Sequence, residues 1–418
     1  MNIPGRRPMP PFPSRPASTD PAIRARICAL SFSLLALCFS GAGAADAMPG
    51  MAKGGAKPEL GASAVFAVDG SLLVAAKQGE HVLLYRSSDE GQSWSAPTTV
   101  NAQPEPISAD GENRPKIAIA ADGGLLVSWT HPFPKPNTGS VRFARADDGE
   151  HFSPPITVHR DSAEITHRFE SLLTTPDNKV ILAWIDKRDL EAAKAGKQPY
   201  AGAAIYAALS TDGGRNFQPE YKVAEHSCEC CRVTSAIDRD GAPLFMWRHV
   251  FAPNERDHAI ARLQPDGRPE KVQRATFDRW KVDGCPHHGP SLVVDAQGTQ
   301  HAVWFNQKEG AGPVHYGRLV TRGNELAVEG QTTVGGPLAA HADLGSADGT
   351  LAIVWKEFDG ERTQLHAMLS ADAGRTFRSV PLGATDGAAD QPRVLARHDS
   401  LFAFWRTEKE GFRLFPLR

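Results

Sequence analysis

The sequence predicts an all-β protein built from one repeated sheet, and two recurring segments carry this prediction. The first is a short apolar strand that ends in tryptophan in most of its copies. Successive copies lie roughly 50–63 residues apart, the length of one four-stranded propeller blade with its loops. The copies occupy residues 72–75, 125–129, 180–184, 244–247, 301–304, 351–355 and 401–405. This spacing predicts a β-propeller of four-stranded blades, with seven blades preferred and six as the alternative.

Turn residues and the lack of helical periodicity support the same architecture. Most copies of the strand follow a tight turn, as a hairpin between the first two strands of a blade requires. Such turns occur at residues 121–124, 240–241 and 347–349. No long segment repeats its apolar residues with the 3.6-residue period of a helix. One excursion, a helix or a loop, is predicted over Asp189–Lys197.

The second recurring segment is a turn motif with the pattern S-x-D-x-G-x-[ST]-[WF]. The copies are Ser87–Trp94, Ser370–Phe377 and Ser210–Phe217, the last with Asn at the [ST] position, and Arg145–Phe152 is a looser copy. The Asp carboxylate is expected to accept backbone N–H groups, and the Gly to adopt a positive φ. These motifs resemble the Asp-boxes of sialidase-like (BNR-repeat) β-propellers, and the resemblance covers essentially residues 60–418. It implies a structural box between the third and fourth strands of a blade, not a catalytic one.

The N-terminal part of the chain has the features of a secretory signal. An apolar run from Ile27 to Phe39 follows a basic leader, and small residues at 42–44 and 45–47 offer cleavage sites. The run is too short for a membrane span. We therefore expect a signal peptide and leader at 1–47, a linker at 48–60 and the propeller at 61–418, in a periplasmic or secreted protein. The last blade has room for three strands, so residues before Gly61 are expected to supply its fourth.

Net charge excludes one class of partner. The formal net charge is −2, and no basic block follows the leader. Nucleic-acid binding requires a concentrated basic surface that displaces counterions. We therefore expect no nucleic-acid partner.

The cysteines outside the leader gather in two short segments, His226–Arg232 and Asp283–Gly289. Each segment directly precedes the first strand of a predicted blade, so the two should meet at the mouth of the central channel, where flanking blades add histidines. The predicted metal ligands are Cys228, Cys230, Cys231, Cys285, His287, His288, His167 and His341. In an extended segment, Cys228 and Cys230 would share one face and Cys231 would point the other way.

Thiolates and imidazoles together favour copper as Cu(I), with zinc as the alternative. An exported chain with these ligands is predicted to capture copper, for buffering or for delivery to an outer- or inner-membrane metal transporter. Its thiols could also reduce Cu(II) stoichiometrically while forming a disulfide. We leave open whether the protein is an enzyme and favour the interpretation that it is not. We assign no catalytic residue and no organic cofactor.

Two other functions stay open. In the first, the cysteines form structural disulfides, and the propeller is a metal-free binding scaffold. The second is a sialidase-like glycoside hydrolase, which the resemblance implies through an arginine triad and a Tyr–Glu pair. Arg168, Arg232 and Arg393 could face the channel, whereas Arg114-Pro115 is only a remnant of the family motif. None of the five tyrosines pairs convincingly with a glutamate at a channel position.

Overall fold

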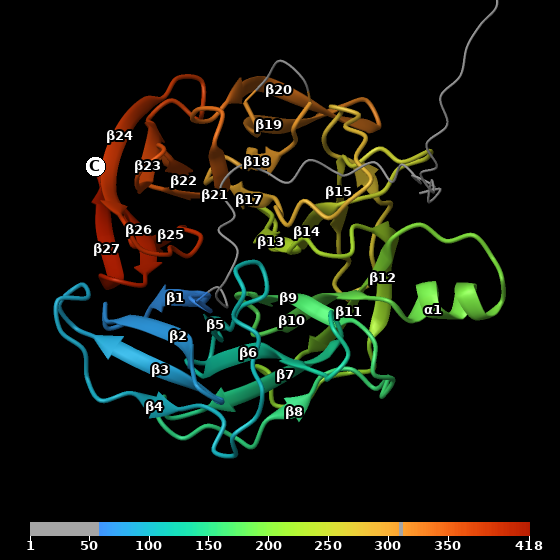
Figure 1. Ribbon diagram of the computed structural model, residues 1–418, viewed down its shortest axis with the longest axis horizontal. Helices are drawn as coiled ribbons and strands as arrows, with labels where there is room; N and C mark the ends of the chain where they lie inside the picture. The colour runs from blue at the N-terminus through green and yellow to red at the C-terminus, as the bar shows by residue number, and fades with distance from the viewer. Residues whose placement is uncertain (1–57, 309–311) are drawn as a thin grey trace, which may run out of the picture. The chain divides into compact units, whose positions relative to one another are not determined.

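The computed structural model describes residues 58–308 and 312–418, which lie in one compact unit, Ala56–Arg418. Their strands form seven antiparallel sheets arranged as the blades of a ring (Figure 1). The first strand of each blade contacts the first strand of the next, and β25 contacts β1. The ring is therefore closed, and the prediction of a seven-bladed propeller is confirmed.

Four strands in sequential order make up each of the first four blades. Blade 1 contains β1 (Ala62–Phe66), β2 (Leu72–Gln78), β3 (His81–Ser87) and β4 (Thr98–Thr99). Blade 2 contains β5 (Lys116–Ile119), β6 (Leu125–Pro132), β7 (Gly139–Ala146) and β8 (Ile156–Thr157). Blade 3 contains β9 (His167–Thr174), β10 (Val180–Asp186), β11 (Ala203–Ser210) and β12 (Tyr221–Ser227). Blade 4 contains β13 (Thr234–Ile237), β14 (Pro243–Arg248), β15 (His258–Arg262) and β16 (Gln273–Arg274).

The last three blades continue this pattern, except that blade 7 has three described strands. Blade 5 contains β17 (Ser291–Val294), β18 (Gln300–Phe305), β19 (Val314–Arg322) and β20 (Glu325–Thr333). Blade 6 contains β21 (Ala339–Ala347), β22 (Thr350–Phe358), β23 (Thr363–Ser370) and β24 (Arg378–Thr385). Blade 7 contains β25 (Arg393–Arg397), β26 (Ser400–Thr407) and β27 (Gly411–Leu417).

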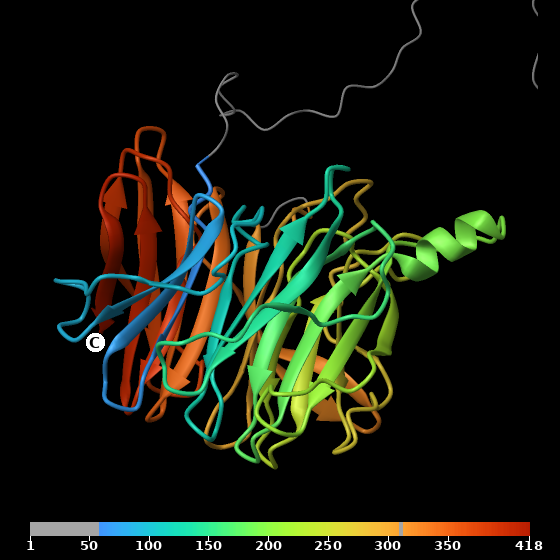
Figure 2. The ribbon, with the colours of Figure 1, turned by 90° about the horizontal axis from the view of Figure 1, so that it is seen from below.

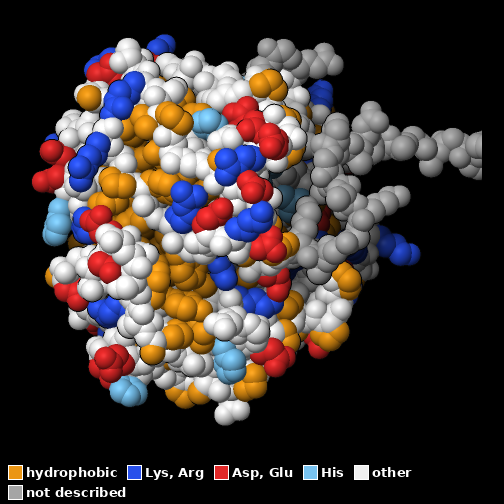
Figure 3. Space-filling model, turned by 60° about the vertical axis from the view of Figure 1, so that its left-hand side comes forward, with side chains coloured by type: hydrophobic (Ala, Val, Ile, Leu, Met, Phe, Trp, Pro, Cys, Tyr) orange, Lys and Arg blue, Asp and Glu red, His pale blue; other side chains and the backbone are white. Residues whose placement is uncertain are grey.

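Blade 7 ends at β27, whose outer edge has no fourth strand among the described residues. Residues 58–61 form none there, and the rest of the segment expected to supply it lies outside the described residues, as do the predicted signal peptide and leader. Phe412, Leu414 and Phe415 of β27 are half-exposed. On this side of the ring, hydrophobic side chains gather among charged ones (Figure 3).

The excursion predicted near residue 190 is a short helix, α1 (Arg188–Ala195), in the connection between β10 and β11. It projects beyond the blades in the side view of the ring (Figure 2). No helix in the described part of the chain is long and apolar enough to cross a membrane.

Packing between blades supplies the core. The recurring apolar strand is the second strand of each blade, and its tryptophans are buried. They are Trp129, Trp184, Trp247, Trp304, Trp355 and Trp405. Because each sheet packs both of its faces against neighbouring blades, these strands are apolar throughout rather than alternating.

The Asp-boxes lie between third and fourth strands, as the resemblance implied. Asp89, Asp212 and Asp372 each accept the N–H group four residues later, at 2.8, 2.9 and 2.9 Å. In the looser copy the neighbouring residue takes this role, because Asp148 accepts the N–H of His151 at 2.8 Å. The side chain of Asp147, at the motif position, instead accepts hydrogen bonds from two arginines.

The box aromatics pack across blade boundaries. Their partners lie in the preceding blade around the ring, with ring centroids about 5 Å apart. The pairs are Trp94 with Phe412, Phe217 with Phe143, and Phe377 with Tyr316. Each box therefore stabilises a turn and fills a seam between two sheets.

Replacing Asp212 with alanine should lower the free energy of unfolding by about 1–3 kcal/mol, because Ser210 Oγ and Asn216 N–H lose their acceptor. Burial would raise the pKa of Asp212, but hydrogen bonds outweigh burial and lower that pKa to about 2. The contribution of Asp212 to stability is therefore complete above about pH 4 and is lost as the pH falls through about 2. Urea denaturation measures the effect. Asp147→Ala is the matched control and should change stability far less. Equal losses in both variants would contradict the assigned role of Asp212.

Candidate metal centre

Two loops that occupy the same position on neighbouring blades carry the cysteines. Residues 228–233 connect β12 to β13, and residues 275–290 connect β16 to β17. Each loop leads into the first strand of its blade, and these two first strands contact each other. The repeat alignment thus placed both segments correctly, although more than fifty residues separate them in sequence.

The four cysteines form one group, termed here the thiol cluster. Cys228 Sγ lies 3.8 Å from Cys230 Sγ and 3.6 Å from Cys231 Sγ. These three side chains are 0, 5 and 1 % exposed. Cys285 is exposed, and its thiol interacts with that of Cys230. All four cysteines are free.

One detail of the sequence prediction is wrong. Cys231 was expected to point away from Cys228 and Cys230, yet all three sulfurs converge. The prediction assumed an extended strand, whereas β12 ends at Ser227 and residues 229–231 form a bend. A bend removes the two-residue alternation of side chains.

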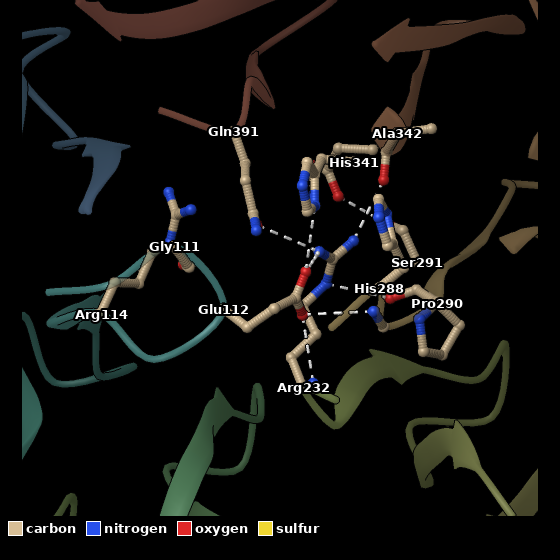
Figure 4. A network of polar contacts seen from close by, with 12 residues as sticks. Gly111, Glu112, Arg114, Arg232, His288, Pro290, Ser291, His341, Ala342 and Gln391 are labelled. Carbon is tan, nitrogen blue, oxygen red and sulfur yellow. Dashed lines mark hydrogen bonds and ion pairs between the residues drawn. The ribbon is translucent and has the colours of Figure 1, made fainter. Parts of the chain in front are cut away.

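A single carboxylate holds the two cysteine-bearing loops together. Glu112 is buried in the loop between β4 and β5. Its Oε2 accepts the backbone N–H of Arg232 at 3.1 Å and that of Gly289 at 3.3 Å (Figure 4). Arg232 follows Cys231 directly, and Gly289 lies four residues after Cys285. Glu112 therefore ties both loops to the same point.

The Arg232 side chain binds Glu112 and also connects the two cysteine loops to blade 6. Its guanidinium donates to Glu112 Oε1 at 3.0 Å, to the Pro290 carbonyl at 3.1 Å and to the Ala342 carbonyl at 3.0 Å. Burial alone would raise the pKa of Glu112, but the Arg232 charge outweighs burial and holds that pKa well below its usual range. A Cβ at Gly289 would lie 2.8 Å from the Arg232 carbonyl oxygen, so only glycine allows this approach.

The protons of the thiol cluster are distributed unevenly. Hydrogen bonds from Cys230 and Cys231 hold the pKa of Cys228 well below its usual range, and the Arg248 guanidinium contributes. Hydrogen bonding to Cys228 raises the pKa of Cys230, and burial raises that of Cys231. Arg256 Nη1 lies 3.9 Å from Cys228 Sγ. Among the three buried thiols, Cys228 is therefore the one that loses its proton most readily, and Cys231 donates a hydrogen bond to it.

Three predicted histidine ligands lie at the channel mouth. His288 and His341 stack with ring centroids 4.0 Å apart, and His341 Nδ1 is 3.5 Å from Glu112 Oε1. His287 is exposed and lines a cavity of about 300 Å³ together with His341 and Glu112. Burial lowers the pKa of His341 to about 4 and that of His288 well below its usual value, so both are neutral at pH 7. Neither belongs to the cysteine group whose ligand atoms all lie within 4.8 Å of one another.

The fourth predicted histidine, His167, belongs to a different group. Its Nε2 lies 3.6 Å from an Asp161 oxygen and 3.7 Å from an Asp186 oxygen, and its ring stacks on that of His159. Arg188 and Trp184 donate to the Asp186 carboxylate, which is thereby occupied. The structure thus divides the eight predicted ligands into the thiol cluster, three histidines at the channel mouth, and His167.

The arginines near the channel are bound to carboxylates. Arg114 makes a bidentate pair with Asp390, at 2.7 and 2.8 Å. Arg232 is held by Glu112, and Arg393 Nη1 lies 3.5 Å from Asp343. Arg168, the other arginine considered for a triad, lies 3.6 Å from Asp110. These side chains are engaged in ion pairs that join blades.

Sequence reasoning missed Glu112, the residue that positions both cysteine loops. No motif surrounds it, although it directly precedes Asn113-Arg-Pro115, the segment that leads into blade 2. A signal was available in Arg232, since an arginine next to a buried cysteine run requires a carboxylate partner.

Comparisons with known proteins identify the architecture alone. No protein-family model matches the sequence, and no curated protein matches it. Solved structures do match. An ulvan lyase, described as a new polysaccharide lyase family, has a TM-score of 0.55 at 12% identity over 85% of this chain and 91% of its own. The polysaccharide lyase Uly1 has a TM-score of 0.55 at 10% identity, covering 88% and 92%. A protein of unknown function from Dyadobacter fermentans has a TM-score of 0.53 at 12% identity, covering 85% and 96%. At such identities the similarity shows a shared propeller fold.

Replacing Glu112 with glutamine should destabilise the protein and expose the buried thiols. The amide turns one acceptor into a donor and leaves the Arg232 charge unpaired, which costs about 3–5 kcal/mol for a buried pair. Urea denaturation measures the stability, and the rate of labelling by a thiol reagent measures cysteine exposure. Glu59→Gln removes the partner of Lys77 at the rim of the same cavity, and is the control. Unchanged labelling in Glu112→Gln would show that Glu112 does not position the loops.

Proposed function

We propose that this chain is an exported protein that captures copper as Cu(I) in the thiol cluster, for buffering or for delivery to a metal transporter. The observation that carries the proposal is the convergence of three buried sulfurs, with a fourth thiol in contact with one of them. Four cysteines meet here from two loops on different blades. Such convergence is expected if the four sulfurs bind one ion together, and it is not expected of cysteines that only fill space in the core.

The sulfur spacing fits an ion bound by thiolates. For metal–sulfur bonds of about 2.3 Å, two ligands of a tetrahedral ion lie about 3.8 Å apart. The separations of 3.8 Å from Cys228 to Cys230 and 3.6 Å from Cys228 to Cys231 agree with that edge. A soft ion can therefore occupy the cluster with little movement of these sulfurs.

Ligand type and surroundings favour Cu(I), with zinc as the alternative. Soft thiolates select Cu(I), whereas structural zinc sites usually pair their cysteines in closely spaced motifs such as C-x₂-C. Outside the leader this chain has one such pair, Cys228 with Cys231, and Cys285 has no partner at that spacing. Three thiolates on Cu(I) carry excess negative charge, and Arg248 and Arg256 are placed to offset it.

The same thiols can reduce copper as they capture it. Two thiolates that join as a disulfide give up two electrons, which convert two Cu(II) ions to Cu(I). Cys230 and Cys285 suit this step because hydrogen bonding between their thiols raises the pKa of Cys230 and lowers that of Cys285. Cys228 and Cys231 then hold one Cu(I), and the second leaves. The reaction is stoichiometric until an external reductant restores the thiols.

Carbohydrate cleavage, suggested by the names of the structural neighbours, has less support from the site. Those neighbours share the fold at low identity, and a fold does not determine an activity. The arginines that a carboxylate-binding triad requires are already paired with Asp390, Glu112 and Asp343. Binding a substrate carboxylate would require breaking these pairs.

The double variant Cys230→Ser/Cys231→Ser should lose tight Cu(I) binding, because only Cys228 and Cys285 of the thiol cluster remain. Competition with the chromophoric chelator bicinchoninate, on reduced protein, measures affinity and stoichiometry. Asp283→Asn, which changes an exposed residue on the Cys285 loop, is the control and should still bind one ion. An unchanged stoichiometry in the double variant would exclude this cluster as the copper site.

Metal binding should release protons. Because the pKa values of Cys230 and Cys231 are raised, both carry protons at pH 7, and binding as thiolates displaces about two protons per ion. Affinity should therefore increase as the pH rises from 6 to 8. Calorimetry in buffers of different ionisation enthalpy measures the proton count. Binding without proton release would mean that these two thiols are not ligands.

A further inference from the structure

The four thiols differ sharply in their access to solvent. Cys228, Cys230 and Cys231 are buried within a hydrophobic core cluster that includes Phe245 and Trp247. Cys285 is exposed, and it lies on a loop of the next blade. A donor or acceptor of copper approaching from solvent therefore meets Cys285 before any other thiol.

The loop around Cys285 is anchored on both sides of its exposed residues. On one side, the Trp280 carbonyl accepts the N–H of Arg256 at 2.7 Å, and Lys281 forms a bridge with Glu255. On the other side, Gly289 is bound to Glu112, and the carbonyl of Pro290 accepts from Arg232. Residues 283–285 and His287 are exposed. Cys285 therefore lies in a short exposed stretch between two anchored points, with its thiol directed to Cys230 on one side and open to solvent on the other.

The buried sulfurs alone provide a complete holding site. Three thiolates satisfy Cu(I), and their spacing already fits an ion, as described above. Cys285 is thus not needed to retain the metal. Its contact with Cys230 instead gives the ion a path between the surface and the buried site.

We infer that Cys285 is a relay ligand that passes Cu(I) between an external thiolate and the three buried cysteines. This inference rests on the proposed function and adds the route of exchange. In the loading step, Cys285 forms a bond to Cu(I) as the external thiolate leaves, and then Cys230 binds the ion as Cys285 leaves. Cys285 gives its proton to solvent as it binds the ion, and on release it takes the proton that Cys230 loses. Cys231 gives its proton to solvent as it becomes the third ligand, and no electron is transferred.

Charge near the relay is already neutralised. Glu229, between the buried cysteines in sequence, forms an ion pair with Lys187, the residue before α1. This pair connects the cysteine bend to the α1 connection of blade 3. The external donor is therefore recognised by its sulfur chemistry at Cys285 rather than by a strong local charge.

The test separates rate from affinity, using Cys285→Ser, Cys228→Ser and a loop control, Asp283→Asn. Copper as Cu(I)–glutathione loads each reduced protein, and excess bicinchoninate removes it, both followed by stopped-flow absorbance. Cys285→Ser should bind one ion with affinity close to wild type, but load and unload slower by on the order of tenfold, because the buried sulfurs then require local opening. Cys228→Ser should lose affinity, and Asp283→Asn should behave as wild type.

Each other outcome is informative. Wild-type loading and unloading rates in Cys285→Ser would overturn the relay while leaving copper binding intact. Loss of the ion in folded Cys285→Ser would also overturn it, because Cys285 would then be a holding ligand. Slowed exchange in Asp283→Asn as well would assign the effect to the loop instead of the sulfur. A wild-type protein that binds no Cu(I) would overturn the proposed function itself.

Discussion

The candidate site depends on one buried interaction, the pairing of Glu112 with Arg232. The carboxylate accepts one backbone N–H from each cysteine-bearing loop, and the guanidinium donates to Pro290 of the Cys285 loop and to Ala342 of blade 6. A buried ion pair is costly to desolvate and contributes little net stability compared with apolar packing. Its value here is geometric: it fixes the loops of blades 2, 4 and 5 to one point, and the relative positions of the sulfurs follow from it.

The propeller explains how sequence segments far apart can build one site. Each blade is a local unit of consecutive strands, and its first strand contacts the first strands of the two neighbouring blades. Loops that lead into first strands therefore lie next to each other on one face, whatever their separation in sequence. Inter-blade packing by buried tryptophans and box aromatics makes this frame rigid. The loops are then free to carry cysteines and histidines that contribute little to the fold.

The parts of this site that follow from periodicity could be predicted from the sequence, and the parts that follow from local backbone geometry could not. Counting the repeated strand placed the Cys228 and Cys285 loops on adjacent blades. It could not reveal the bend at residues 229–231, nor that His287 and His341 adopt positive φ values of 53° and 54°, which redirect their side chains. Glu112 escaped because its role arises from a contact with residue 232, which lies in another blade and leaves no pattern in sequence.

The location of the buried sulfurs also bears on the kind of metal binding proposed above. In small zinc domains, ligand binding supplies the folding energy, and the protein unfolds without the ion. Here Cys228, Cys230 and Cys231 pack as ordinary core residues among Phe245, Trp247 and their neighbours, and a protonated cysteine behaves as a small apolar side chain. A large β core holds these side chains in place whether or not they bind an ion. In the proposed function, the binding energy of the ion is therefore not required for folding and is available for capture and exchange, which makes the ion cargo and not a structural component.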